Sequence, residues 1–290
     1  MTERAWVTEN VAPGVRVEYE ANRVLYHARS AKHEKLLIDN AQFGRLLMLD
    51  GTVRATSADE FILHEMMSHV PLLAHGKARQ VLIVGGGDCG LADEVLKHPG
   101  VVRLTQIETD PQVVKLARSY LRSVNASPFT DPRFSLHIGD GAAFVTSTED
   151  RFDVILVPAS DLGPQSLPLF TESFYRDARG CLNAGGVLVA QIGVPFLQPL
   201  EFCANMKRLG TVFPEVGCFL VPVPSYFGGP LAFGWGSGAL KPEAVSVQEL
   251  GERRAGLILP TRYYTPDVHK AAFALPHYLV EALDVALAPG

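Results

Sequence analysis

The segment Val81-Leu82-Ile83-Val84-Gly85-Gly86-Gly87-Asp88-Cys89-Gly90 decides the fold. Its four apolar residues are typical of a strand that is buried on both faces of a parallel sheet. The glycines let the backbone turn sharply and approach a ligand, and the next stretch, 91–98, is rich in helix formers. A strand, a glycine loop and a helix N-terminus in this order cradle a nucleotide. The segment therefore predicts a nucleoside site on an α/β sheet.

A second strand strengthens this prediction. Gly85, Gly87 and Gly90 satisfy the pattern G-x-G-x-x-G, which fits dinucleotide sites and methyltransferase-like sites equally. The apolar run Val102–Ile107 ends in Glu108, which lies 18 residues after Gly90. An acidic residue at the end of the second strand can accept hydrogen bonds from both hydroxyls of a ribose. The alternative, a glycine-rich turn without a ligand, does not explain both features.

Two regions with different periodicity predict two domains. Alternating apolar residues between 14 and 56, with a turn at Asp50-Gly51, predict a small antiparallel β domain over 1–56. Ser57-Ala58-Asp59-Glu60 reads as a capping box for a helix that extends to about Leu73. From residue 80 onward strands and helices alternate, and strands near 214–222 and 231–236 close the pattern. The fold class predicted for 57–290 is a Rossmann-like, methyltransferase-type doubly wound α/β sheet, with a helical tail over 266–287.

Composition excludes several classes of protein. The chain has 290 residues, 47% of them hydrophobic, and a net charge of −5, so no basic footprint indicates nucleic acid. No apolar run is long enough to span a membrane, and no signal-type segment stands at the N-terminus. Its four cysteines are scattered without a C-x-x-C pair, which predicts reduced thiols and no metal site. We therefore expect a cytoplasmic protein without a membrane or nucleic-acid partner.

Several carboxylates should meet at one edge of the sheet. Ligands of doubly wound sheets bind outside the carboxyl ends of the strands. Four segments reach that edge: Gly85–Gly90, Glu108–Asp110, Gly139–Gly141 and Pro158–Pro164. They bring together Asp88, Glu108, Asp140 and Asp161, which suits a cationic ligand. Helix capping is the competing explanation for Asp110 and Asp140, because each precedes a helix.

The motifs, taken in order, resemble the spermidine synthase (polyamine aminopropyltransferase) family. The resemblance extends from about residue 30 to residue 280. The matching segments are Leu49–Gly51, Asp59–Phe61, His64–Met66, Gly85–Gly90, Glu94–His98, Glu108, Gly139–Gly141, Asp161, Gly163-Pro164, Leu169–Glu172, Phe174-Tyr175, Pro195–Gln198, Tyr263-Tyr264, His269 and Phe273–Pro276.

This resemblance implies a reaction and a role for each site residue. Decarboxylated S-adenosylmethionine would donate an aminopropyl group to putrescine or a related polyamine, with methylthioadenosine as product, no resident cofactor, and a homodimer or homotetramer as the assembly. The donor site would comprise Glu34, His64, Gly85, Gly86, Gly87, Asp88, Glu108, Asp140 and Gly141. Asp88 would hold the donor ammonium, Glu108 the ribose and Asp140 the adenine amine. Asp161 would be catalytic, and Asp88, Asp161, Tyr226, Tyr263 and Tyr264 would bind the acceptor.

Departures from the family pattern gather on the acceptor side. The resemblance places Pro158 where the family has the first Asp of an Asp-x-x-Asp-Pro loop, the group that would take the proton of the attacking amine. Leu63 replaces a tyrosine and Leu231 a tryptophan, while Glu34, after His33, replaces a glutamine. On the donor side, Cys89 breaks the second glycine pair and Asp93 replaces an arginine, but the carboxylates remain.

Three interpretations of these departures stay open. Asp161, or a water that it orients, takes the proton; or the acceptor is a different amine or nucleophile; or the protein binds the nucleoside with little turnover. A methyltransferase that uses S-adenosylmethionine is an alternative, but Asp88 would repel the carboxylate of that donor. An NAD-dependent oxidoreductase is a more distant one, because no second mononucleotide-binding half is evident.

Overall fold

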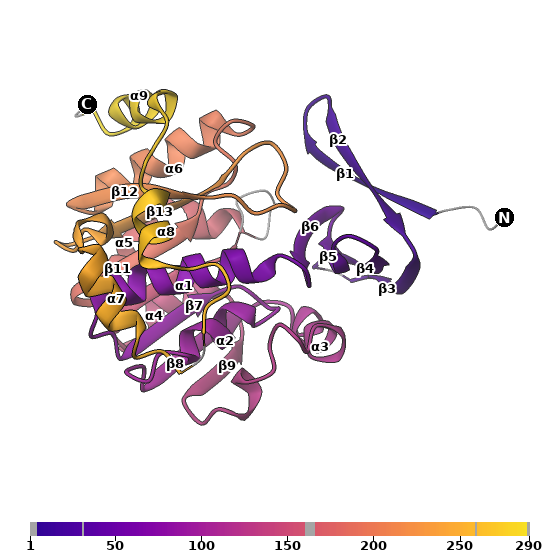
Figure 1. The fold of residues 1–290 in the computed structure, drawn as a ribbon, viewed down its shortest axis with the longest axis horizontal. Coiled ribbons are helices and arrows are strands. Elements are labelled where there is room, and N and C mark those ends of the chain that lie inside the picture. Colours follow the sequence, from indigo (N-terminus) through magenta and orange to yellow (C-terminus); the bar gives the residue numbers. More distant parts are fainter. Residues whose placement is uncertain (1–4, 31, 160–165, 259, 289–290) are drawn as a thin grey trace.

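The computed structural model describes residues 5–30, 32–159, 166–258 and 260–288. Six strands form the N-terminal part in two antiparallel sheets (Figure 1). A ribbon pairs β1 (Ala5–Ala12) with β2 (Val15–Ala21). The other sheet has the order β3 (Arg23–Arg29), β4 (Glu34–Asn40), β5 (Gly44–Leu49) and β6 (Thr52–Thr56). The predicted small antiparallel β region is confirmed, but the sequence did not predict β1. The only fully buried side chain of β1 belongs to Glu9, so this strand lacks an apolar period.

A seven-stranded sheet forms the rest of the scaffold. Its order is β12 (Glu215–Val221), β13 (Leu231–Ser237), β11 (Leu182–Gln191), β10 (Phe152–Val157), β7 (Gln80–Val84), β8 (Arg103–Glu108) and β9 (Phe134–Ile138). The strands β9, β8, β7, β10 and β11 run parallel, and β13 is antiparallel to both of its neighbours, β11 and β12. The chain reverses its winding direction between β7 and β10, which is where such sheets bind ligands. The predicted Rossmann-like fold class is confirmed.

Helices cover both faces of this sheet (Figure 1). One face packs against α1 (Glu60–His75), α2 (Gly90–Leu96), α7 (Val247–Arg254) and α8 (Pro266–Ala272). The other packs against α4 (Gly141–Ser147), α5 (Glu172–Gly180), α6 (Pro199–Val212) and α9 (His277–Ala286). The short turns η1 (Pro128–Thr130), η2 (Leu167–Phe170) and η3 (Pro242–Ala244) lie between these elements. None of the helices in the described ranges is both long and apolar enough to cross a bilayer.

One local prediction was wrong, and one helix was not predicted. The helical tail predicted over 266–287 is confirmed and consists of two helices, α8 and α9, whereas α7 was not predicted. The capping box is absent: the Oγ of Ser57 accepts the N–H of Arg45 at 2.9 Å instead of capping α1. Asp59 occupies the N-cap position without a capping bond, because its carboxylate binds the Thr56 hydroxyl at 2.5 Å and the Ser225 N–H at 2.6 Å. That carboxylate therefore ties the start of α1 to a distant loop.

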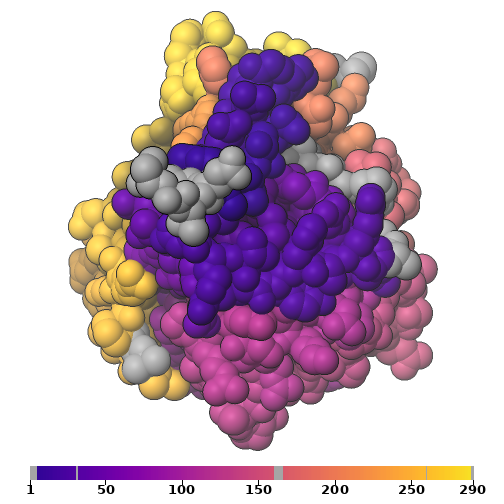
Figure 2. Space-filling model, turned by 90° about the vertical axis from the view of Figure 1, so that its right-hand side faces the viewer, coloured from indigo at the N-terminus to yellow at the C-terminus, as the bar shows by residue number. Residues whose placement is uncertain are grey.

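Helix α3 (Pro111–Tyr120) joins the two parts of the chain. It follows β8, and its apolar side chains pack against the four-stranded sheet. The buried cluster consists of Val113 and Ala117 of α3, Leu121 and Val124 just after it, and Leu37, Leu47 and Ala55 of the sheet. Figure 2 shows the purple surface of the N-terminal strands directly against the magenta surface that contains α3. The N-terminal sheet is thereby held over the carboxyl ends of the parallel strands.

Candidate active site

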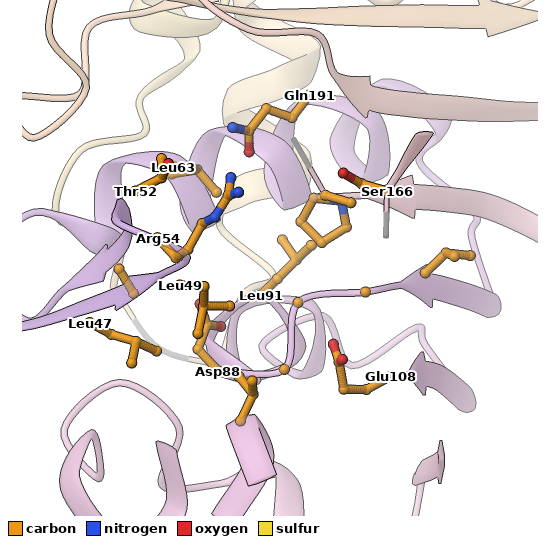
Figure 3. Close-up of a pocket in the computed structure, with 18 of the residues that line it drawn as sticks. Leu47, Leu49, Thr52, Arg54, Leu63, Asp88, Leu91, Glu108, Ser166 and Gln191 are labelled. Atoms are coloured by element: carbon orange, nitrogen blue, oxygen red, sulfur yellow. The ribbon is translucent and has the colours of Figure 1, made fainter. Parts of the chain in front are cut away.

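A cavity of about 530 Å³ lies between the parallel sheet and the N-terminal sheet (Figure 3). Its floor is formed by the loops after β7, β8, β9 and β10, and its roof by residues of β5, β6 and the turn between them. It is therefore found at the switch point where the sequence predicted a ligand. The volume is sufficient for a drug-sized ligand.

The glycine loop leaves space for a ligand at the floor of this cavity. Gly85 and Gly86 have φ angles of +96° and +71°, which side chains other than glycine rarely adopt. A Cβ at Gly87 would stand 3.0 Å from the Glu108 carboxylate. The bare backbone at Gly87 thus keeps the side of that carboxylate accessible. Cys89 also has a positive φ of 60°, but its buried thiol has a raised pKa because burial disfavours the thiolate.

Glu108 and Asp140 are each fixed by backbone groups. Oε1 of Glu108 accepts the N–H of Asp110 at 2.8 Å. Burial raises the pKa of the Glu108 carboxyl and outweighs the hydrogen bonds from Asp110 and Thr109, which act to lower it. Oδ1 of Asp140 accepts the N–H groups of Ala142 and Ala143 at 2.8 and 3.0 Å, so Asp140 caps α4. Both still line the cavity. The capping role and the binding role are compatible, because a carboxylate has two oxygens.

Asp88 belongs to a buried row of three ionisable groups. The His64 ring places Nδ1 2.7 Å from Glu60 Oε2 and Nε2 3.6 Å from Asp88 Oδ1. Burial acts to lower the pKa of His64, but the Asp88 and Glu60 carboxylates outweigh it and raise this pKa to about 10. Asp88 Oδ1 also accepts the Gly90 N–H at 2.9 Å. His64 is therefore a cation at neutral pH that holds Asp88 in place.

The N-terminal sheet supplies side chains that sequence reasoning did not identify. Thr52 and Arg54 of β6 line the cavity, as does Gln191 at the end of β11. Figure 3 draws the polar end of Arg54, from β6, turned toward that of Gln191, from the end of β11. His33 Nδ1 lies 2.6 Å from Asp50 Oδ2. Burial acts to raise the pKa of Asp50, but hydrogen bonds from His33 and from the Glu34 N–H outweigh it and lower this pKa. An alternating strand pattern could have indicated that Thr52 and Arg54 share a face, but not what that face contacts.

Comparisons with known proteins agree with this geometry. Residues 60–247 match the family model described as "Spermine/spermidine synthase domain", and residues 5–57 match "Spermidine synthase tetramerisation domain". The chain belongs to the spermine/spermidine synthase family. A polyamine aminopropyltransferase of Ruegeria sp. (strain TM1040) is 43% identical over 96% of this chain and 98% of its own length. One of Pectobacterium carotovorum subsp. carotovorum (strain PC1) is 44% identical over 92% of this chain and 93% of its own.

Solved structures of the family share the whole fold. A spermidine synthase in complex with the transition state analogue AdoDATO superposes with a TM-score of 0.92 at 32% identity, over 98% of this chain and 96% of that one. Spermidine synthase from Thermotoga maritima superposes with a TM-score of 0.88 at 32% identity, over 97% of this chain and 94% of that one. The resemblance to this family is therefore confirmed, and so is the prediction of a transferase enzyme of the aminopropyltransferase class.

Most of the donor-side residues expected for this family member do line the cavity. His64, Gly85, Gly86, Gly87, Asp88, Glu108, Asp140 and Gly141 are all among its lining residues, as is Tyr226 from the acceptor side. Pro158 and Leu63, two of the departures from the family pattern, line it too. These two changes therefore fall within the site itself, whereas Glu34, Cys89, Asp93 and Leu231 are not among its lining residues. Asp161 lies outside the described residues.

Glu34 does not line the cavity. Its Oε1 lies 2.8 Å from Nε2 of His27 on the neighbouring strand, and both side chains are about half exposed. The register of β3 and β4 pairs Arg29 with Glu34, and the neighbouring His33, not Glu34, lines the cavity. A direct contact of Glu34 with the donor has no support in the structure.

Tyr263 and Tyr264 also lie elsewhere, behind α1. The Oε2 of Glu65, a buried residue of α1, accepts the N–H groups of Tyr263 and Tyr264 at 2.8 and 2.7 Å. The Tyr264 hydroxyl is 2.9 Å from Nδ1 of His269, and neither tyrosine is among the cavity residues. Their expected contact with the acceptor is replaced by a structural role, since they dock the C-terminal segment onto α1.

Proposed function

We propose that the chain transfers the aminopropyl group of decarboxylated S-adenosylmethionine to a primary amine and releases methylthioadenosine. The observation that carries this proposal is the order of carboxylates along one cavity floor: Asp140, Glu108 and then Asp88 with its histidine. This order suits, in turn, an adenine amine, a ribose and an ammonium tail. The donor is a co-substrate, so we propose no resident cofactor.

The chemistry assigns distinct tasks to these groups. The donor sulfonium activates the adjacent carbon and leaves as a neutral thioether, so the leaving group needs no acid. The acceptor amine must lose a proton before it attacks. We propose the carboxylate of Asp161 as the proton acceptor. Pro158 has no group that can take a proton, and His64, with its raised pKa, is already protonated at neutral pH. Asp88 orients the donor tail next to the attacking nitrogen.

Asp88 separates this proposal from a methyltransferase. The His64 ring balances one negative charge, but Glu60 on its other side supplies a second, so the row of three groups stays negative overall. A donor that retains its α-carboxylate would place a further negative charge there. Pro158 favours a second candidate, a protein that binds the nucleoside with little turnover.

The proposal is tested by titrating the protein calorimetrically with decarboxylated S-adenosylmethionine, S-adenosylmethionine and methylthioadenosine, and by detecting aminopropyl transfer to amines by mass spectrometry. We expect binding of the decarboxylated donor and product, and transfer that Asp161→Asn reduces by about 10²–10⁴-fold while methylthioadenosine affinity is unchanged. Binding without transfer to any amine would support the second candidate. Preference for S-adenosylmethionine would support the methyltransferase.

We further propose that the chain forms a homodimer or homotetramer through its N-terminal strands and works in the cytoplasm. The match of residues 5–57 to a tetramerisation domain supports the assembly, and so do the exposed apolar side chains of Trp6, Val15 and Val24. Sedimentation of the protein and of Trp6→Ser/Val24→Ser tests it, since the variant should dissociate. The described cysteines are all free thiols, which suits a reducing compartment.

A further inference from the structure

Two buried amide side chains hold the backbone of the glycine loop without lining the cavity. Nε2 of Gln106, on β8, donates hydrogen bonds to the carbonyl oxygens of Gly85 at 2.8 Å and Gly86 at 2.6 Å. Nδ2 of Asn125, which follows α3, donates to the carbonyl oxygen of Asp88 at 2.6 Å. Both side chains are buried, and neither contributes to the cavity wall. Any effect of these amides on a ligand is therefore transmitted through the loop.

The alternation of β8 places Gln106 at the loop. Side chains two residues apart on a strand point to the same face of a sheet, so Gln106 shares its face with Glu108, which lines the cavity floor. Gln106 pairs in register with Ile83, near the end of β7. A Cβ at Gly86 would stand 3.6 Å from Nε2 of Gln106 and 2.9 Å from Cγ of Pro158. The loop backbone at Gly86 thus lies between the amide and the proline of the cavity wall.

The Gln106 amide determines which way two loop peptides face. In a trans peptide the carbonyl of one residue and the N–H of the next point in opposite directions. Because the carbonyls of Gly85 and Gly86 are directed at Gln106, the N–H groups of Gly86 and Gly87 point away from it. The three glycines line the cavity and Gln106 does not, so these N–H groups face the ligand. Within the described ranges, neither N–H donates to another residue.

An amide at position 106 is unfavourable for the core itself. Oε1 of Gln106 is buried without a hydrogen-bond partner among the described residues, which costs free energy that an apolar side chain would not. Leu104 and Ile83, on the same face of the sheet, belong to the hydrophobic cluster that packs against α1 and α2. The packing of this face therefore gives no reason for an amide, and the two bonds to the loop do.

We infer that Gln106 and Asn125 are positioning residues for the donor nucleoside, on which they act through the glycine loop. The inference rests on the proposed binding of decarboxylated S-adenosylmethionine and specifies how that site is preorganised. Gln106 turns the loop N–H groups toward the oxygen atoms of the sugar, beside the Glu108 carboxylate. Asn125 fixes the backbone of Asp88, and with it the carboxylate proposed for the ammonium tail. A site held in its binding geometry binds more tightly than one that must rearrange.

Two ligands separate the two roles, because methylthioadenosine lacks the ammonium tail of decarboxylated S-adenosylmethionine. Gln106→Met and Gln106→Leu each remove the amide on the sugar side, and both ligands should bind about tenfold more weakly to either variant. Asn125→Leu acts on the tail side. It should weaken binding of the decarboxylated donor about tenfold and that of methylthioadenosine by less than about threefold. Calorimetric titration of the full chain measures each affinity.

Asn183→Leu is the matched control, because it removes an amide from the opposite end of the sheet. Nδ2 of Asn183 donates to Oδ1 of Asp153 at 2.9 Å. The other oxygen of Asp153 accepts the N–H groups of Arg79 and Gln80 at the start of β7. Asn183→Leu should lower the urea midpoint of unfolding and leave both affinities within about twofold of the parent, since distant sites act independently.

Urea unfolding of all four variants distinguishes positioning of the ligand from stability of the fold. Affinities that fall in step with the urea midpoint, in Asn183→Leu as well, would show that the amides only stabilise the fold and would overturn the inference. Parental affinities in the Gln106 and Asn125 variants would overturn it too. An equal loss of both ligands in Asn125→Leu would remove Asn125 from the tail side.

The parent protein separates this inference from the proposed function. A parent that binds neither ligand would contradict the proposed function itself. A parent that binds both, with the same affinities in the Gln106 and Asn125 variants, contradicts only the inference about the two amides.

Discussion

The ammonium of Lys35 lies 2.7 Å from the carboxylate of Asp110, and both side chains are almost fully buried. Lys35 belongs to β4 of the N-terminal sheet, and Asp110 caps α3 just after Glu108. The approach of Nζ to Oδ2 is not aligned as a hydrogen bond, so the pair is held by charge. It connects the roof of the cavity to the strand end that would bind the ribose.

Removing one member of this pair should destabilise the protein strongly. Lys35→Met leaves Asp110 charged and buried, and we expect the free energy of unfolding to fall by about 3–5 kcal/mol. Lys35→Met/Asp110→Asn should recover most of that loss, since Asn still caps a helix. Urea unfolding measures both. Arg23→Gln, which breaks the exposed pair with Asp39, should cost at most about 1 kcal/mol. Equal losses for Lys35→Met and Arg23→Gln would show that the buried pair does not join the two parts.

The His64 row predicts a dependence of stability on pH. The folded protein raises the pKa of His64 from 6.5 to about 10, because the Asp88 and Glu60 carboxylates outweigh the effect of burial. A raised pKa contributes stability that is fully present below the unfolded value and is lost as the pH rises through the folded one. The stability difference between the parent and His64→Gln should therefore be largest near pH 6 and shrink toward pH 10. Urea unfolding at pH 6, 8 and 10 checks this, and a constant difference would contradict it.

Glu108 should carry much of the nucleoside affinity. Glu108→Gln replaces a charged acceptor by an amide, and we expect methylthioadenosine to bind about 10–100-fold more weakly, in keeping with about 1.5–3 kcal/mol for a hydrogen bond to a charged group. Calorimetric titration measures the change. Glu34→Gln is the same substitution outside the cavity, where Glu34 pairs with His27, and it should leave the affinity unaltered. A loss in Glu34→Gln as large as in Glu108→Gln would restore Glu34 to the donor site.

The proline at position 158 should limit transfer to diamines. Pro158→Asp introduces a carboxylate on the cavity wall, and we expect transfer to putrescine to rise, because a positioned base contributes about 10²–10⁴-fold. Initial rates measured by mass spectrometry compare the variant with the parent. No increase in Pro158→Asp over the parent would mean that position 158 does not determine use of a diamine.

Local sequence patterns predicted the floor of the site but not its roof. The glycine loop, Glu108 and Asp140 follow strands directly, so the topology of parallel strands alone brings them to one edge. Arg54 reaches the same cavity only because the N-terminal sheet packs on α3, which no local pattern specifies. Glu65 is another example: no local pattern predicted that its buried carboxylate accepts the backbone N–H groups of residues 262–264.

The most direct test of the account is a crystal structure of the protein with methylthioadenosine. We predict that the ribose hydroxyls lie within hydrogen-bond distance of the Glu108 carboxylate and that the adenine amine faces Asp140. A nucleoside bound elsewhere, or a cavity beside these two carboxylates that stays empty at saturating methylthioadenosine, would contradict it.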